Sequence, residues 1–508
     1  MKEQKTILGP PGCGKTQTNS NLIHKYIKQG IDPDKIACVS FTKKAATESR
    51  ERVCKNWNLT EEDLPYFQTL HSMAFQVLGL KPTEVMQSSD IRKIGYEVGL
   101  DFNSSTSDVE NDFDVIGYKK GDAYLNIYQL SRSKKIPVED VFQQTGDYNL
   151  DYSELTRLIG AYNSYKKAHN KIDFTDMIEQ FIREETIPNI EVLIVDEAQD
   201  LSTLQWTMID VLRTVPSIQI FTGDDDQAIM NFQGADVKAF LTATEKKEVL
   251  HQSYRVPPPI FDEAQTIVNK IAGRAPKEWK PKDAPGTVNF HWNLVDVPIN
   301  EGEWTILGRT NRILDRYAME LRNEGWIYNR HGHPSIPKKH YEGILAWESL
   351  CKGEEITIQQ ARNIYTLMKV GEGFKRGYGP RSSPLLNLAG EALVNMDYLR
   401  KDLGLLVDGE KRWHQVLGKI GLDMQHYILN ALKRGDNVKN PRIKLSTIHS
   451  IKGGEDDNIL LIPDISYAAY KEYERNPSIE HRVFYVGVTR AKKNLHIMQP
   501  QTERFYNI

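Results

Sequence analysis

The chain has 508 residues, which is enough for roughly two to four domains that each bury their own core. Hydrophobic residues make up 40% of it and charged residues 26%, the balance of a soluble globular protein, so a disordered chain and a membrane protein are excluded. The net charge of -3 gives no overall attraction to polyanions, so nucleic-acid binding would require a local groove.

The 4 cysteines are scattered and include no CxxC pair, which predicts neither a zinc ribbon nor a disulfide framework. Such cysteines suit a reducing cytoplasm. Residues 1–6 are polar and run directly into a glycine-rich loop, which leaves no room for a signal peptide. We therefore expect a cytoplasmic protein, located in the host cytoplasm if the chain is viral.

Short apolar runs, most of them followed by polar or glycine-containing turns, predict buried parallel strands. They occupy residues 36–41, 192–195, 218–221, 304–307, 459–462 and 495–498. Helical patterns at residues 43–57 and 205–213 lie between them. This alternation predicts an α/β fold with parallel sheets and right-handed crossovers.

Two stretches interrupt the alternation, residues 74–170 and about 331–440, and their helical patterns predict inserted helical subdomains. Loops are expected at residues 331–339, 371–383 and 433–441, where glycine, proline or charge is crowded. The loose histidine cluster at His331, His333 and His340 has no cysteine or carboxylate at metal-ligand spacing, so we expect no metal there.

The first chemical motif is the segment GPPGCGKT at residues 9–16, which follows a strand-like run and precedes a helical one. That context is the one a phosphate-binding P-loop requires. Its glycines let backbone N–H groups converge on the β-phosphate, Lys15 reaches the β and γ oxygens, and the Thr16 hydroxyl binds Mg²⁺.

The second motif is an apolar strand that ends in two adjacent carboxylates, Asp196 and Glu197. Together with a P-loop, Asp196 can hold Mg²⁺ and Glu197 can polarise the water that attacks the γ-phosphate. An acidic pair after a strand is usually only a solvated turn, so this interpretation depends on the P-loop.

A family resemblance appears in the segments DEAQD at residues 196–200 and GDDDQ at residues 223–227, which resemble the UvrD/Rep family of superfamily 1 helicases. Other segments are similar to the motifs of that family and occur in the same order: VSFTKKAA (39–46), TLHS (69–72), QSYR (252–255), RTN (309–311), TIHSIKGGE (447–455) and YVGVTRAKK (485–493). The resemblance extends from Gly9 to Lys493.

The resemblance implies roles around the nucleotide. Gln227 would sense the γ-phosphate, and Arg255 and Arg490 would act as arginine fingers from the second motor domain. Tyr254 would stack on the adenine, and Glu455 would contact the nucleotide or its metal. The implied catalytic residues are Lys15, Asp196, Glu197, Gln227, Arg255 and Arg490, with Thr16 and Asp196 at the metal. The implied nucleotide-binding residues are Gly9, Pro10, Gly12, Gly14, Lys15, Thr16, Gln17, Tyr254 and Glu455.

For the nucleic acid, Phe41 and Phe232 are the candidates for base stacking, a sequence-tolerant contact. By analogy with the family, Thr42, His71 and His449 would contact the backbone. Packing in the core is the alternative for either phenylalanine.

The sequence departs from the family at several positions. The glutamine-containing segment that precedes the P-loop in the family is absent, and Gln4 is the only nearby substitute. Met230 and Gln233 stand where the family has tyrosine and arginine, so the coupling of ATP to DNA is expected to be weaker or to follow a different route. Gly454 replaces a leucine.

The resemblance implies two RecA-like motor domains with parallel sheets, each with a mostly helical insertion. We expect the first motor domain at residues 1–75 and 171–248 with its insertion at 76–170, and the second at 249–330 and 441–508 with its insertion at 331–440.

The implied activity is that of a DNA helicase that uses ATP with Mg²⁺, moves 3′ to 5′ on single-stranded DNA and unwinds duplex at single-strand/double-strand junctions. Replication, repair and recombination are the expected processes, single-strand-binding and replication proteins are candidate partners, and a monomer without membrane contact is expected. Two alternatives stay open: a translocase that strips proteins from single strands without unwinding, and an ATP-switched loading factor in a replication or repair complex.

Overall fold

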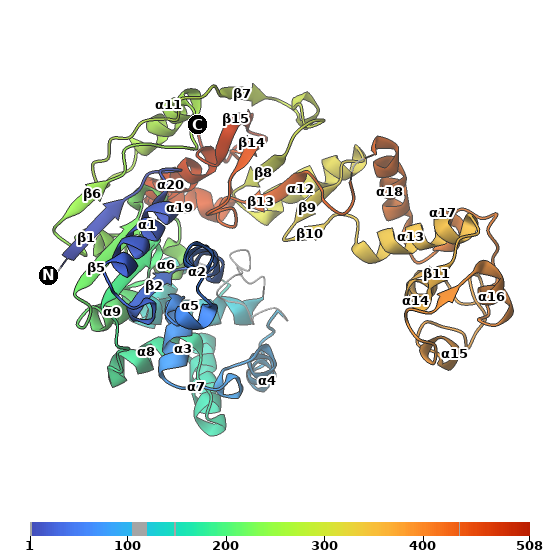
Figure 1. Cartoon of the computed structure of the whole chain (residues 1–508), viewed down its shortest axis with the longest axis horizontal. Helices are drawn as coiled ribbons and strands as arrows, with labels where there is room; N and C mark the ends of the chain where they lie inside the picture. Colours follow the sequence, from blue (N-terminus) through green and yellow to red (C-terminus); the bar gives the residue numbers. More distant parts are fainter. Residues whose placement is uncertain (1–2, 104–118, 147–148, 436) are drawn as a thin grey trace. The chain divides into compact units, whose positions relative to one another are not determined.

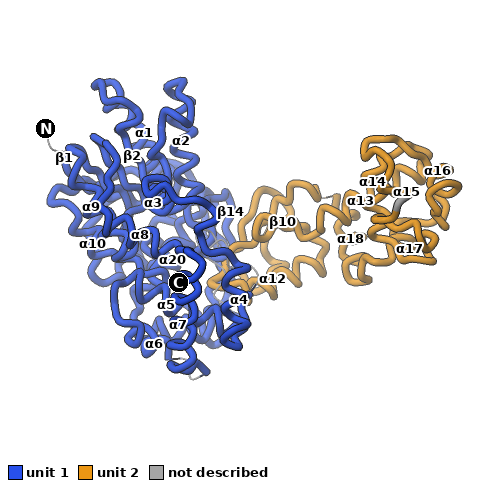
Figure 2. Tube along the Cα trace, turned by 90° about the horizontal axis from the view of Figure 1, so that it is seen from below, with its two compact units in different colours: residues 1–290, 447–508 blue, residues 291–446 orange. Residues whose placement is uncertain are grey.

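The computed structural model describes residues 3–103, 119–146, 149–435 and 437–508. The chain forms two compact units, unit 1 with Met1–Phe290 and Thr447–Ile508 and unit 2 with His291–Ser446 (Figure 2). Within the described ranges, every helix is too short or too polar to reach across a lipid bilayer.

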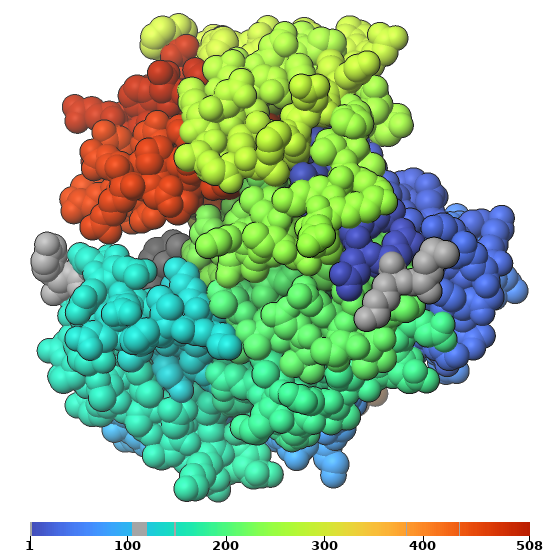
Figure 3. All heavy atoms as spheres, turned by 90° about the vertical axis from the view of Figure 1, so that its left-hand side faces the viewer, coloured from blue at the N-terminus to red at the C-terminus, as the bar shows by residue number. Residues whose placement is uncertain are grey.

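Unit 1 contains a 6-stranded sheet in the order β3-β2-β4-β5-β1-β6 (Figure 1). The strands are β1 (Glu3–Leu8), β2 (Ile36–Ser40), β3 (Phe67–Gln68), β4 (Val192–Asp196), β5 (Ile218–Gly223) and β6 (Lys247–Val249). Neighbouring strands are parallel. Because β1 pairs with both β5 and β6, the start of the chain, blue in Figure 3, lies beside green residues from the middle of the chain.

Successive residues of these strands point to opposite faces of the sheet, and each face has its own apolar core. Val39 belongs to the core formed with α3 (Leu70–Val77), α8 (Phe174–Glu184) and α9 (Thr203–Leu212). Its neighbour Cys38 belongs to the core formed with α1 (Lys15–Lys28) and α2 (Lys43–Trp57). The strands are buried on both faces, which explains why they are continuous apolar runs in the sequence.

Both helices expected from the sequence are present, and side-chain caps set where they begin. The Thr42 hydroxyl accepts from the backbone N–H of Ala45 at 3.2 Å and starts α2. Ser202 and Gln205 form a capping box that starts α9 two residues earlier than the apolar pattern indicated.

The first insertion is helical, as expected. It consists of α4 (Ser88–Val98), α5 (Lys120–Lys134), α6 (Val138–Thr145) and α7 (Tyr152–His169) around a separate core that includes Ile94, Tyr124 and Leu158. Residues 104–118 and 147–148 of the expected insertion lie outside the described residues.

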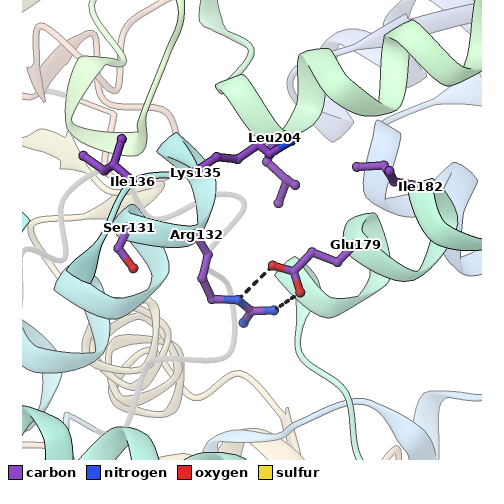
Figure 4. A pocket seen from close by; sticks show the side chains of 7 residues that line it. All are labelled: Ser131, Arg132, Lys135, Ile136, Glu179, Ile182 and Leu204. Carbon is purple, nitrogen blue, oxygen red and sulfur yellow. Dashed lines mark hydrogen bonds and ion pairs between the residues drawn. The ribbon is translucent and has the colours of Figure 1, made fainter.

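Arg132 of α5 anchors this insertion to α8. Its Nε and Nη2 donate to the two carboxylate oxygens of Glu179 at 3.1 and 2.8 Å (Figure 4), and Nη1 and Nη2 reach Asp173 and Asp176. A second cation, Lys166 of α7, bonds to the same two aspartates. A cavity of about 310 Å³ beside Arg132 is lined by Ser131, Arg132, Lys135, Ile136, Glu179, Ile182 and Leu204.

The rest of unit 1 holds a second group of strands in the order β14-β15-β7, with β14 and β15 parallel. These strands are β7 (Thr287–His291), β14 (Asp456–Leu461) and β15 (Ala491–Met498). Of the remaining helices of unit 1, α10 (Val237–Thr242) adds Phe240 to the core of the first sheet. The helices that accompany the second group of strands are α11 (Pro258–Val268), α19 (Tyr467–Arg475) and α20 (Pro477–Val488). The most buried of them is α20, which contacts α11 and the turn after β5.

Unit 2 begins with strands in the order β10-β9-β13-β8, beside α12 (Asn311–Asn323). These strands are β8 (Trp304–Gly308), β9 (Tyr328–Arg330), β10 (His333–Pro334) and β13 (Ile443–Thr447). The loop expected at residues 331–339 is only partly a loop, because β10 pairs antiparallel with β9 and the next helix begins at Lys338.

The remainder of unit 2 is mostly helical around a core that includes Trp347, Tyr365 and Trp413. Its helices are α13 (Lys338–Cys351), α14 (Ile358–Leu367), α15 (Ser383–Leu386), α16 (Met396–Lys401), α17 (Trp413–Val416) and α18 (Leu422–Arg434). A short antiparallel pair, β11 (Ile356–Thr357) and β12 (Leu393–Val394), accompanies them. The α/β class with parallel sheets and helical insertions is therefore confirmed.

Candidate active site

The glycine-rich loop joins β1 to α1 at the carboxyl edge of the first sheet. Gly12 and Gly14 have left-handed φ values of 69° and 80°, which only glycine adopts without strain. A Cβ at Gly12 would lie 2.3 Å from the Cβ of Arg255, so the position also requires a glycine for space. The N-terminus of α1 therefore presents its backbone N–H groups as an anion site.

Lys15 lies within this loop, with its side chain 11% exposed. Its Nζ donates to the carbonyl oxygen of Gly9 at 2.9 Å and lies 3.9 Å from Oε1 of Glu197. Burial alone would lower the pKa of Lys15, but Glu197 and other nearby acidic groups outweigh burial and raise the pKa above its ordinary value. The ammonium group therefore stays charged and within reach of an anion bound to the loop.

The two carboxylates that end β4 have opposite electrostatic environments. Burial, with a further contribution from Glu197, raises the pKa of Asp196 to about 6, although Asp196 accepts a hydrogen bond from Thr222 Oγ1 at 2.9 Å. Burial would also raise the pKa of Glu197, but the charge of Lys15 outweighs it and lowers that pKa. Glu197 therefore remains ionised, as a group that polarises water must be.

The backbone of Glu197 has a φ of 51° in the left-handed region, a conformation that costs on the order of 1 kcal/mol for a side chain other than glycine. Gln199 holds the carboxylate, since its Nε2 donates to Oε2 of Glu197 at 2.6 Å. The Oε1 of Gln199 in turn accepts from the backbone N–H of Asp224 at 3.0 Å. The ends of β4 and β5 are thus joined through one amide side chain.

Arg490 and Gln227 meet in the centre of the site. Nη2 of Arg490 donates to Oε1 of Gln227 at 2.8 Å, and Nε2 of Gln227 donates to Oδ2 of Asp224 at 2.7 Å. Arg490 is only 2% exposed. Burial, with a further contribution from Arg255, lowers the pKa of Arg490 to about 9, which still leaves it charged at neutral pH.

The QSYR segment lies directly on the glycine-rich loop. Ser253 Oγ donates to the carbonyl oxygen of Pro11 at 2.8 Å, and the backbone N–H of Tyr254 donates to that of Gly12, also at 2.8 Å. Arg255 follows, with its Nε 2.5 Å from Oε2 of Glu455. The Tyr254 side chain is 73% exposed, so its ring is available to a ligand.

Lys452 is a residue that the sequence analysis did not select, although it lies inside the TIHSIKGGE segment. Its Nζ donates to Oδ1 of Asp200 at 2.7 Å and to the carbonyl oxygen of Gln227 at 2.7 Å. Burial raises the pKa of Asp200 to about 6 in spite of this partner. Its position inside a segment that resembles a family motif was the sequence feature that could have pointed to Lys452.

A second missed group surrounds the acidic turn Asp225–Gln227. The buried Lys277 Nζ lies 2.8 Å from carboxylate oxygens of Asp224 and of Asp226, and also contacts Asp225. Arg274 binds Asp226 with two hydrogen bonds of 2.9 and 2.6 Å. Arg274 and Lys277 are about 50 residues from their partners in sequence and belong to no segment that resembles the family motifs, so no local pattern pointed to them.

Comparison with known proteins then decides the relationship. Residues 1–248 match the UvrD/REP helicase N-terminal domain, and residues 416–502 match the UvrD-like helicase C-terminal domain. Together the two matches cover more than half of the chain. The chain belongs to the UvrD/Rep helicase family.

Among relatives of this UvrD/Rep-family chain, one from Rickettsia conorii, named a probable DNA helicase II homolog, is 23% identical over 99% of this chain and 91% of its own length. The ATP-dependent DNA helicase PcrA of Leuconostoc citreum is 26% identical over 68% of this chain and 50% of its own length. The ATP-dependent DNA helicase Rep of Buchnera aphidicola is 25% identical over 46% of this chain and 35% of its own length. The last two matches span half or less of those relatives.

At the level of the family, these matches confirm three expectations: the UvrD/Rep family, the RecA-like P-loop fold and the class of ATP-dependent DNA helicases. The roles assigned to single residues stay predictions. Gln17, one of the implied nucleotide-binding residues, donates to Asn21 Oδ1 at 2.9 Å. Gln4, the nearby substitute for the glutamine segment of the family, lies on β1 and donates to Gln219 Oε1 at 3.2 Å.

The expected DNA-contacting residues of this UvrD/Rep-family chain have different settings. Phe232 is 41% exposed and packs edge-on against His449, with ring centroids 5.4 Å apart. Phe41 is partly buried against the core of the sheet. Thr42 caps α2, and the His71 ring packs edge-on against Phe174 at 5.7 Å. The fold brings Phe232 and His449 of this set into ring contact.

Proposed function

We propose that this chain hydrolyses ATP at the P-loop and uses the energy to move 3′ to 5′ along single-stranded DNA and to unwind the duplex ahead. The observation that carries this proposal is that Arg255 packs against Gly12 of the glycine-rich loop, while Arg490 is bonded to Gln227 and its charge acts on Glu197. A P-loop alone binds a triphosphate, whereas two added arginines can neutralise the charge of the phosphoryl group in transfer.

The donor set at the loop fits Mg²⁺. The Thr16 hydroxyl and the Asp196 carboxylate are hard oxygen ligands, and the raised pKa of buried Asp196 shows a carboxylate that a cation would stabilise in its charged form. Bound Mg²⁺ would supply neutralisation of the β- and γ-phosphate oxygens.

In the proposed mechanism, Lys15 exchanges the Gly9 carbonyl oxygen for phosphate oxygens, since both are acceptors of the same ammonium protons. Glu197, ionised and held by Gln199, orients the attacking water and takes up its proton. Arg255 and Arg490 neutralise the charge on the phosphoryl oxygens, as an arginine finger does.

The route from hydrolysis to DNA would be short. Gln227, which is bonded to Arg490, lies five residues before Phe232, and Phe232 packs against His449. Phe232 would stack on a base, while the neighbouring His449 would contact the DNA backbone. A shift of Gln227 with the state of the phosphate would move the base platform in the same stretch of chain.

Two assays on the full chain test the proposal. ATP turnover should rise several-fold when a single-stranded oligonucleotide is added, and a duplex with a 3′ single-stranded tail should be unwound faster than one with a 5′ tail. A rate of ATP turnover that does not change when the oligonucleotide is added would favour an ATP-switched loading factor. Stimulated turnover without strand displacement on either tail would favour a translocase that strips bound proteins.

A further inference from the structure

The helical insertion carries a cleft away from the residues described above. It lies between α4 and α7 and has a volume of about 440 Å³. Its lining consists of Arg92, Lys93, Tyr96, Glu97, Tyr165 and His169. Two cations and three flat rings thus surround one opening.

The rings form a prepared surface. The Tyr96 side chain is 91% exposed, an unusual position for a large aromatic ring. Across the cleft, His169 stacks on Tyr165 with ring centroids 3.9 Å apart and an interplanar angle of 19°. The Tyr165 hydroxyl donates to Asp90 at 2.9 Å, and the His169 Nδ1 bonds to the Tyr165 carbonyl oxygen at 3.0 Å, so this ring pair is fixed in place.

The cations lie one turn before the exposed ring. Arg92 and Lys93 precede Tyr96 on α4 by four and three residues, so all three lie on one face of the helix. Both are exposed, and among the described residues neither has a carboxylate within 4.0 Å. Glu97 also lines the cleft, and its negative charge counteracts the positive charges of Arg92 and Lys93.

The opposite face of α4 secures the helix independently. Ile91, Ile94 and Val98 are buried in the core of the insertion. Changes at Arg92, Lys93 or Tyr96 therefore remove chemical groups from the cleft without removing the contacts that hold α4 in place.

We propose that this cleft binds single-stranded nucleic acid, with bases stacked on Tyr96 and on His169 and with phosphates on Arg92 and Lys93. Tyr165 is buried and supports the exposed His169 ring from below. A flat exposed ring beside two cations fits an unpaired strand, since duplex bases are stacked on each other and present no free face. The proposal rests on the proposed function in that the strand is the DNA along which the chain moves. The cleft would hold a part of that strand outside the ATPase site.

The first test measures the affinity of the full chain for a fluorescently labelled oligothymidine at several salt concentrations. Tyr96→Ala should weaken binding about 5-fold or more, while Tyr96→Phe should stay near the parent because it keeps the ring. Arg92→Ala/Lys93→Ala should lower the slope of log affinity against log salt by about 1.4, or about 0.7 for each lost phosphate contact. Glu97→Gln should bind more tightly than the parent.

The matched control is Arg183→Ala/Lys28→Ala, which removes two exposed cations that do not line the cleft. Equal affinity and equal salt slope in this control and in the Arg92/Lys93 variant would overturn the proposal. So would a loss for Tyr96→Ala that appears with blunt duplex but not with oligothymidine. Photo-crosslinking of a 5-iodouracil strand to Tyr96, found by mass spectrometry, is the expected positive result.

The failure of this inference can be told from a failure of the proposed function. If the unaltered chain shows no stimulation of ATP turnover by oligothymidine, the proposed function fails. If stimulation is present and the cleft variants bind the strand like the control, only the cleft assignment fails.

Discussion

The guanidinium of Arg490 donates to the side-chain oxygen of Gln227 across 2.8 Å, although 263 residues separate the two in sequence. Gln227 passes this contact on to Asp224, whose backbone N–H is bonded to Gln199. The residue that follows α20 by two positions is thus connected to the carboxylate end of β4 through three side chains. A change in the position of Arg490 would therefore shift the side chains that hold the Glu197 carboxylate.

Arg490→Ala is expected to lower the turnover number for ATP by about 1,000-fold or more, because the charge of an arginine finger is lost. Nucleotide affinity should change far less, since the P-loop and Lys15 are intact. Steady-state kinetics and a fluorescent nucleotide titration separate the two quantities. Lys493→Ala, which removes an exposed cation paired with Asp457, is the control and should keep its turnover. Unchanged turnover in Arg490→Ala would contradict the assigned role.

Gly12→Ala is expected to abolish nucleotide binding. The new methyl group would stand 2.3 Å from Arg255, at a φ of 69° that alanine adopts poorly. Gly30→Ala is the matched control, because Gly30 has a φ of 92° but has no atom within 4 Å of the added Cβ. It should cost about 1 kcal/mol of stability and leave nucleotide affinity intact. Similar nucleotide affinities in the two variants would rule out the close packing of Gly12 against Arg255.

Asp196→Asn is expected to stabilise the protein at neutral pH while abolishing turnover. Because the folded pKa of Asp196 is raised to about 6, the folded state binds a proton more tightly than the unfolded state, and ionisation of Asp196 destabilises the fold as pH rises from about 4 to about 6. The gain should reach up to about 3 kcal/mol near pH 7.5 and shrink near pH 5. Denaturant unfolding without Mg²⁺ at both pH values measures it. A gain independent of pH would argue against ionisation as its cause.

Lys277→Met is expected to destabilise the protein by about 3 to 5 kcal/mol, because three buried aspartates lose their shared cation. Urea unfolding of the full chain checks this value. Lys280→Ala, three residues away with an exposed side chain, should change stability by less than about 0.5 kcal/mol. Equal stability of the two variants would show that the acidic turn does not depend on Lys277.

Phe232→Ala should weaken binding of single-stranded DNA about 5-fold or more with little change in stability, since the ring is 41% exposed. Phe41→Ala should instead lower stability, because Phe41 packs against the core of the sheet. DNA titration and thermal unfolding of both variants give the comparison. The reverse pattern would exchange the roles of the two rings.

Local patterns predicted the parts of the fold that depend on neighbours in sequence. The P-loop, the strand that ends at Asp196 and the helix Lys43–Trp57 all follow from runs of apolar residues, glycines or caps within a few positions. The loop expected at residues 331–339 was partly wrong because β10 is only two residues long, too short for any periodicity to appear.

The parts of the site that escaped prediction are contacts across long stretches of chain. Lys452 meets Asp200 over a separation of 252 residues, and Lys277 meets Asp224 over 53. A single lysine has no periodic signature, so its buried partner cannot be inferred from its neighbours. Thr42 shows the opposite difficulty. It lies in a segment that resembles a family motif and was expected to contact DNA, and its side chain also caps α2.

The contacts of Ser253 and Tyr254 with the glycine-rich loop have one more consequence. Both use main-chain carbonyl oxygens of Pro11 and Gly12 as acceptors, so a change of side chain at Pro11 leaves these acceptors in place. The position of Tyr254 therefore depends on the backbone path of the loop and not on the side chain at position 11. A chain with another residue at position 11 would still place the Tyr254 ring beside the loop, provided that the loop keeps its backbone conformation.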